Sequence, residues 1–183
     1  MEPDPDADLV MRIGRGDRAA AETLMARHLP KMLALARRML AGRDEAEAED
    51  AVQEAFLKVW RHAGRWRPGK ARFETWLYRV VLNQCYDRLR RKASASLEAA
   101  AEVADAAPLP GSGLERAERA AAVTAALNRL PERQKTALLL CHFEEMSNIK
   151  AAETMGLSVE AMESLLSRGR RALRAMLSDL KEG

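Results

Sequence analysis

Apolar residues recur at intervals of three and four positions along nearly all of this 183-residue chain, with polar and charged residues between them. Such spacing places apolar side chains on one face of an α-helix, whereas alternating, β-branched runs bounded by turn residues are absent from the sequence. The pattern therefore predicts an all-α fold. Breaks in it divide the chain into helices over about Arg18–His28, Pro30–Leu40, Asp44–His62, Phe73–Arg91, Glu115–Arg129, Pro131–Phe143, Ser147–Met155 and Val159–Leu180.

Residues that start and stop helices support these boundaries. Asp17 is suited to cap the first helix, Pro30 to open the second and Gly42 to end it. The acidic turn that follows Asp44 suits the positive end of a helix dipole. The stretch "GRWRPGKAR" then interrupts the pattern with two glycines and a proline, which predicts a loop.

One segment differs from the rest in composition. Residues 93–114, which include "ASASLEAAAEVADAAPLPGSG", contain no aromatic and no basic residue and are rich in Ala, Pro, Gly and Ser. With so few large apolar residues this segment cannot bury a face of its own, so it is predicted to be a flexible linker. The chain is expected to form two small helical domains, residues 1–92 and 115–183.

The net charge of +3 hides a strong segregation of charge. Residues 58–92 carry 11 basic and 2 acidic side chains, and residues 164–183 carry 5 and 2, whereas residues 43–57 carry 1 basic and 6 acidic. Two separate basic blocks suit a chain that binds a polyanion at two places, although solvated helix surface would have the same composition.

Several classes of protein are disfavoured by the sequence. Cys85 and Cys141 are far apart in helical contexts, which does not support a disulfide framework, and the histidines are scattered, so no metal or other cofactor is expected. The apolar runs are too short to cross a membrane and the acidic N-terminus lacks an apolar core, which predicts a cytoplasmic protein without membrane insertion. Without a cluster of acid, base and nucleophile, no catalytic residue is predicted.

The last two helices have the features of a helix-turn-helix. Ser147 and Ser158 are suited to cap them, Gly156 to form the turn, and two small alanines to let them cross closely, with Ile149, Leu157 and Met162 filling the angle between them. Gly169 inside the second helix indicates a close approach to another element. The face opposite the apolar stripe of that helix is predicted to enter a DNA major groove, and its residues are Ser158, Glu160, Glu163, Ser164, Ser167, Arg168, Arg170 and Arg171. An ordinary helical hairpin is the alternative.

The helix from Phe73 has a second chemical character. Leu77, Val81, Cys85 and Leu89 form an inward stripe, while Arg79, Asn83, Tyr86 and Arg90 share another face. This face offers guanidinium groups, an amide and a phenol ring, and it is preceded by the aromatic residues Trp66, Phe73 and Trp76. Such a surface suits single-stranded DNA, because cations follow phosphates and aromatic planes stack on unpaired bases. The aromatic residues are equally compatible with a role in the core.

Three stretches carry a specific resemblance. "DEAEAEDAVQEAFLKVW", "FETWLYRVVLN" and "SNIKAAETMGLSVEAMESLLSRGRRAL" resemble the sigma-70 family of RNA polymerase sigma factors, in its small extracytoplasmic-function (ECF) group. Within the group, the variant "ESLLSR" resembles the branch associated with metal-resistance regulons. The resemblance implies a sigma-2-like first domain, a sigma-4-like second domain, and no enzymatic activity.

It also implies sites and partners. The first domain would bind the β′ clamp helices of core RNA polymerase through Asp50, Gln53, Glu54, Leu57, Lys58 and Trp60. Val52, Phe56 and either Val59 or Leu57 would anchor that helix inward. The same domain would melt and read the minus-10 promoter element through Trp66, Arg72, Trp76, Arg79, Asn83, Tyr86, Arg90 and Arg91, with Asn83 at the family position that contacts a flipped base. The second domain would contact the β flap and read the minus-35 element through the helix-turn-helix face.

The predicted function is that of a sigma factor that directs core polymerase to specific promoters and begins to open them. Members of the family are usually held inactive by an anti-sigma factor, so the chain is expected to be a monomer when free or a 1:1 complex with such a partner. Two alternatives remain open from the residues alone: a dimeric helix-turn-helix regulator that acts without polymerase, and a helical adaptor without nucleic-acid function.

Overall fold

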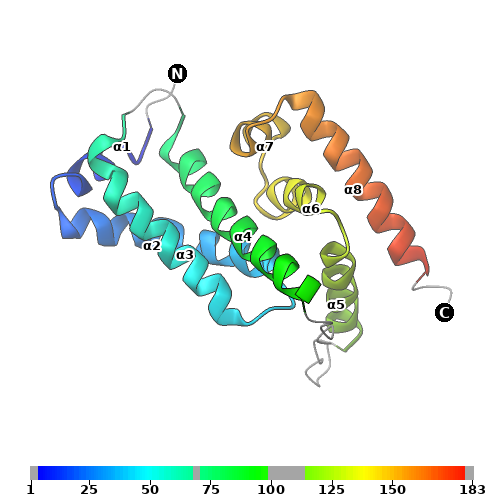
Figure 1. The fold of residues 1–183 in the computed structure, drawn as a ribbon. Coiled ribbons are helices and arrows are strands. Elements are labelled where there is room, and N and C mark those ends of the chain that lie inside the picture. Colours follow the sequence, from blue (N-terminus) through cyan, green and yellow to red (C-terminus); the bar gives the residue numbers. More distant parts are fainter. Residues whose placement is uncertain (1–3, 68–70, 99–113, 180–183) are drawn as a thin grey trace. The chain divides into compact units, whose positions relative to one another are not determined.

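The computed structural model describes residues 4–67, 71–98 and 114–179, and within them every regular element is helical (Figure 1). This confirms the all-α prediction. The elements are α1 (Ala7–Ile13), α2 (Arg18–Met39), α3 (Glu45–His62), the 3-10 turn η1 (Ala63–Arg65), α4 (Phe73–Glu98), α5 (Leu114–Asn128), α6 (Glu132–Leu138), the π-helical turn η2 (Leu139–Phe143), α7 (Asn148–Met155) and α8 (Val159–Asp179).

The described residues fall into two compact units. The first lies within Met1–Arg37 and Asp44–Arg91, and the second within Arg38–Arg43 and Lys92–Gly183. Each has its own buried apolar side chains: Leu24, Leu35, Val52, Phe56, Phe73, Leu77 and Val81 in the first, and Leu138, Leu139, Leu140, Met162 and Leu166 in the second. Burial of apolar surface is the main favourable term in folding, so each unit has its own source of stability.

The structure joins the first two predicted helices into one. Asp17 caps α2 as expected, since its Oδ1 accepts a hydrogen bond from the Ala20 N–H at 3.1 Å. Pro30, however, lies inside the helix, so the prediction that it opens a second helix is wrong. Its missing N–H leaves the Ala26 carbonyl without the usual partner, but both residues are exposed, where this carbonyl is open to solvent.

The next two helices set the scaffold of the first unit. Asp44 caps α3 by accepting from the Ala46 N–H at 3.1 Å, and Gly42 adopts a positive φ of 83° after α2 has ended, as the sequence predicted. The α4 helix begins at Phe73 as expected but continues to Glu98, past the predicted end at Arg91 and into the predicted linker. The remainder of that linker, residues 99–113, lies outside the described residues.

The second unit contains the predicted helix-turn-helix. Ser147 accepts from the Lys150 N–H and Ser158 from the Ala161 N–H, both at 3.2 Å, and Gly156 provides the left-handed turn with φ 64°. Met162 is fully buried, but Ile149 is 69% exposed, so the prediction that it fills the angle between the helices is wrong. Ile149 stands in the first turn of α7, at the far end of that helix from Gly156.

Gly169 marks a close approach of α8 to α6. A Cβ atom on Gly169 would stand 2.9 Å from Cδ1 of Leu138 and 3.3 Å from its Cγ. Leu138 is only 2% exposed, so its side chain has little room to move away. The close approach expected from the sequence is confirmed, and it fixes α8 against the interior of the second unit.

Candidate functional site

The α3 helix presents one polar face to solvent. Ala48, Ala51, Val52, Ala55, Phe56 and Val59 are buried on its inner side. Val59 is fully buried whereas Leu57 is 44% exposed, which settles the inward position that the sequence left open. Asp50, Gln53, Glu54, Leu57 and Lys58 are all exposed, and the half-buried Trp60 lies at their edge; these six residues are called the α3 face below.

An apolar groove of about 360 Å³ lies between α2 and α3, beside the α3 face. Its floor and walls combine Met25, Leu29 and Leu33 from α2 with Val52, Phe56, Leu57 and Trp60 from α3. Sequence reasoning missed the three α2 residues, although their spacing of four positions gives a signal of a shared helix face. A groove of this shape, next to exposed polar side chains, suits an apolar side chain on a partner helix.

Two members of the α3 face also make contacts within the first unit. Glu54 Oε1 lies 3.1 Å from Nη2 of Arg88, whose side chain is only 11% exposed. The Trp60 ring packs edge-on against Phe56, with 5.4 Å between the ring centroids. Glu54 therefore links α3 to α4 as well as facing solvent, and substitution of Glu54 would remove an ion pair from a mostly buried guanidinium.

The predicted minus-10 residues form a line on α4 and at its start. Leu77, Val81 and Cys85 are fully buried on the opposite side, as predicted for the inward stripe, whereas its fourth member, Leu89, is only half-buried. The outer line has members at intervals of three and four residues, some exposed (Arg72, Asn83, Arg90) and some half-buried (Trp76, Arg79, Tyr86), and is called the α4 face below. Arg91 is also exposed but stands one residue beyond this line, so it points to a different side of the helix.

Aromatic rings surround the first turn of α4. Phe73 is fully buried, so the core interpretation holds for this residue. Trp66 and Trp76 are half-buried and pack against Phe73 with centroid distances of 6.3 and 5.8 Å. The two tryptophans therefore combine packing against the core with a partly open ring, which leaves surface for stacking on a base.

All eight residues predicted for the minus-35 element are exposed; seven lie on α8, and Ser158 immediately precedes that helix. Four of them, Glu163, Ser167, Arg170 and Arg171, line a groove of about 520 Å³ together with Arg174 and with Asn148 from α7. Sequence reasoning did not include Asn148, whose place in the groove depends on how α7 and α8 pack. The groove combines amide, hydroxyl and guanidinium groups, which are the side-chain types that contact phosphates and base edges.

Some of these eight side chains are held by neighbours. Arg170 Nε donates to Nε2 of His142 at 3.3 Å, and Arg168 Nε donates to the Ser164 carbonyl at 3.3 Å. At the start of α8, the backbone N–H of Glu160 and the hydroxyl of Ser158 donate to the Glu160 carboxylate and hold its pKa below the ordinary 4.5. Ser158 and Glu160 thus stabilise the start of the helix, whereas Arg170 and Arg171 line the groove further along it.

Comparison with known proteins identifies the chain. Residues 24–95 match sigma-70 region 2, and residues 120–173 match sigma-70 region 4. The chain is 35% identical to the ECF RNA polymerase sigma factor SigM of Mycobacterium tuberculosis over 97% of its own length and 87% of that protein. It belongs to the sigma-70 family, in the ECF group. This sigma factor is accordingly a transcription initiation factor and not an enzyme.

Other relatives agree with this assignment. Two relatives belong to the metal-resistance branch. The sigma factor is 33% identical to NccH of Alcaligenes xylosoxydans, over 96% of each chain, and 30% identical to CnrH of Cupriavidus metallidurans, over 95% of each. Its structure is similar to that of CnrH in complex with the cytosolic domain of CnrY, with a TM-score of 0.70, 28% identity and coverage of 95% and 97% of the two chains. Within the described residues, no helix is both long and apolar enough to span a bilayer.

Proposed function

We propose that this sigma factor divides its work between two domains. The first, over residues 1–92, binds core RNA polymerase and captures unpaired bases of the minus-10 element; the second, over residues 115–183, reads the duplex minus-35 element and contacts the β flap. Residues 93–114 connect them. The observation that carries the proposal is the apolar groove between α2 and α3, bordered by the exposed α3 face.

Contact with polymerase is assigned to the α3 face and the groove together. An exposed polar face alone gives little affinity, because surface ion pairs contribute at most about 1 kcal/mol each. The groove adds apolar surface that a helix of the β′ clamp covers on binding, and Leu57 belongs to both features. Gln53 and Lys58 then orient the partner helix through polar contacts.

Promoter opening is assigned to the α4 face. Asn83 is exposed midway along the line, where its amide is available to donate to and accept from the edge of a flipped base. Arg90 pairs with Asp87 on the surface, and such an exposed pair is weak enough for Arg90 to bind a phosphate instead. The partly open rings of Trp66 and Trp76 give stacking surfaces next to this line.

Regulation is assigned to an anti-sigma factor. CnrH has been solved in complex with the cytosolic domain of CnrY. The groove between α2 and α3 is lined mainly by apolar side chains and suits a helix from either an anti-sigma factor or polymerase. We expect the two partners to compete for it, with the sigma factor monomeric when free and 1:1 with its anti-sigma factor.

In vitro transcription tests the proposal. Purified sigma factor and core polymerase are incubated with genomic fragments, and start sites are mapped from the transcripts. We expect transcripts only when both proteins are present, and promoter binding that weakens with salt by a slope of about 0.9 per phosphate contact in log affinity against log salt. A dimer that shifts the same DNA without core polymerase would refute the proposal.

A further inference from the structure

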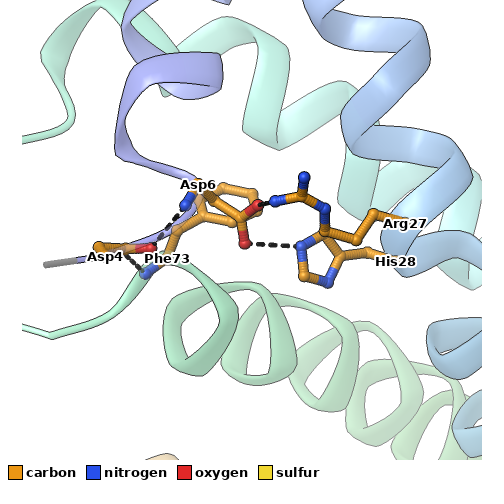
Figure 2. A network of polar contacts seen from close by, with 5 residues as sticks. All are labelled: Asp4, Asp6, Arg27, His28 and Phe73. Atoms are coloured by element: carbon orange, nitrogen blue, oxygen red, sulfur yellow. Dashed lines mark hydrogen bonds and ion pairs between the residues drawn. The ribbon is translucent and has the colours of Figure 1, made fainter. Parts of the chain in front are cut away.

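Asp4 joins two parts of the first unit that are far apart in sequence. Its Oδ2 accepts a hydrogen bond from the backbone N–H of Phe73 at 2.5 Å, across 69 residues of chain. Its Oδ1 accepts from the N–H of Asp6 at 3.0 Å (Figure 2). One carboxylate therefore holds its own segment in a turn and contacts the first residue of α4.

The segment that carries Asp4 is itself anchored in the interior. The Asp6 carboxylate, with a side chain only 3% exposed, accepts a hydrogen bond from Arg27 and lies 2.8 Å from Nε2 of His28 (Figure 2). The His28 ring packs edge-on against Phe73, with 5.7 Å between the ring centroids. Asp6 thus attaches the segment to α2, and this attachment holds the neighbouring Asp4 in place.

The helix that follows Asp4 and Asp6, α1, contacts η1, the turn that precedes Trp66. Gly14, at the end of α1, lies so close to Gly64 in η1 that a Cβ on Gly14 would stand 2.8 Å from the Gly64 Cα. The N-terminal segment therefore contacts η1, which precedes Trp66, and the start of α4, which carries Trp76. These contacts lie on both sides of the region to which we assign base capture.

The N-cap position of α4 is occupied by an arginine. This residue, Arg72, has a side chain with donors only, so this side chain cannot accept from the exposed N–H groups of the first turn. A carboxylate at this end of a helix satisfies an N–H group and interacts favourably with the helix dipole. Asp4 supplies that carboxylate from outside the helix.

We propose that Asp4 is a positioning residue for promoter opening: it fixes the first turn of α4, so that Trp76 and the neighbouring Trp66 are in place before a base is captured. This inference rests on the proposed function, because Asp4 acts through the α4 face and does not itself contact DNA. It assigns to the acidic N-terminal segment a role in opening that its sequence alone did not suggest.

The test uses full-length Asp4→Ala with core polymerase, on a promoter fragment that the wild-type protein opens. The opening rate is followed by a fluorescent adenine analogue in the minus-10 element. We expect opening about fivefold slower, the fold-change that corresponds to about 1 kcal/mol for a lost cap. On the same promoter with a premelted minus-10 region, Asp4→Ala should behave as wild type, and its affinity for core polymerase should be unchanged.

Two further variants separate positioning from general destabilisation. Asp4→Asn retains one side-chain oxygen that accepts from the Phe73 N–H but loses the second oxygen, which accepts from the Asp6 N–H, so it should restore part of the opening rate. Asp8→Ala removes the same charge from an exposed side chain of the same segment and should leave opening unchanged. Amide hydrogen exchange at Phe73 should be faster in Asp4→Ala and close to wild type in the other two.

The outcomes distinguish the inference from the proposed function. If the wild-type protein does not open any promoter with core polymerase, the proposed function fails and the inference fails with it. If the wild type opens the promoter and Asp4→Ala opens it equally fast, the inference alone is wrong. A defect of equal size on duplex and premelted promoters would also overturn it, because that result indicates damage to the whole unit.

Discussion

Leu57 provides a quantitative test of polymerase binding. It is 44% exposed in the free protein and lines the groove between α2 and α3. Full burial of a leucine side chain contributes about 1.5–3 kcal/mol, so covering the exposed 44% contributes about 1 kcal/mol. We therefore expect Leu57→Ala to weaken the affinity for core polymerase about fivefold. Because Leu57 is already substantially exposed, the variant should fold with nearly the wild-type stability.

The chain offers a matched control for this variant. Met11 is a large apolar residue on α1 that is also 44% exposed, but it does not line the groove. Both variants are titrated with core polymerase, and binding is followed by the fluorescence anisotropy of a dye on the sigma factor. Met11→Ala should bind as wild type. Equal weakening in both variants, or a change of less than about twofold for Leu57→Ala, would refute the assignment of the groove to polymerase.

Three further predictions concern other parts of the protein. Asn83→Ala should slow promoter opening and relax discrimination at one minus-10 base in transcription assays, with core binding unchanged; equal discrimination by wild type and variant would remove the assigned contact. Gly169→Ala gains about 1 kcal/mol in helix propensity but costs about 1–3 kcal/mol in overpacking against Leu138, so circular dichroism should show a net loss of about 1 kcal/mol in the second unit. All three tryptophans belong to the first unit, so the unfolding transition followed by tryptophan fluorescence should not move. A Gly169→Ala protein more stable than wild type would contradict the close packing against Leu138. The Asp17 carboxylate accepts from the Ala20 N–H and from Arg12, which lowers its pKa below 3.8. Its contribution to stability is therefore present above pH 3.8 and is lost as the pH falls through the lowered pKa. An NMR titration midpoint at or above 3.8 would disprove this.

The surfaces of single helices were predictable because their determinants are local. The exposed side of α3 and the line on α4 follow from residue spacing within one helix, and the caps at Asp17, Asp44 and Ser158 act within three residues. The specific roles of these surfaces came from the family resemblance, which the comparisons confirmed at the level of the family. The assignment of individual residues to polymerase or promoter DNA remains a prediction.

Features that combine distant segments were not predictable in the same way. The groove needs α2 and α3 side by side, and the pairing of Glu54 with Arg88 needs α4 beside α3. Pro30 is another example, because its local preference for a helix start was overridden by a continuous helix whose buried residues on both sides of the proline pack into one core.

The sequence by itself determined that the chain is helical, where most of its helices begin, and which side of each recognition helix is polar, because hydrogen bonds and side-chain spacing within a helix involve residues at most four positions apart. Only the tertiary structure decided that Asp4 contacts the start of α4 and that Gly169 meets Leu138. Contacts of that kind depend on how whole helices pack, and close packing of a core is a property of many residues together rather than of any one stretch of sequence.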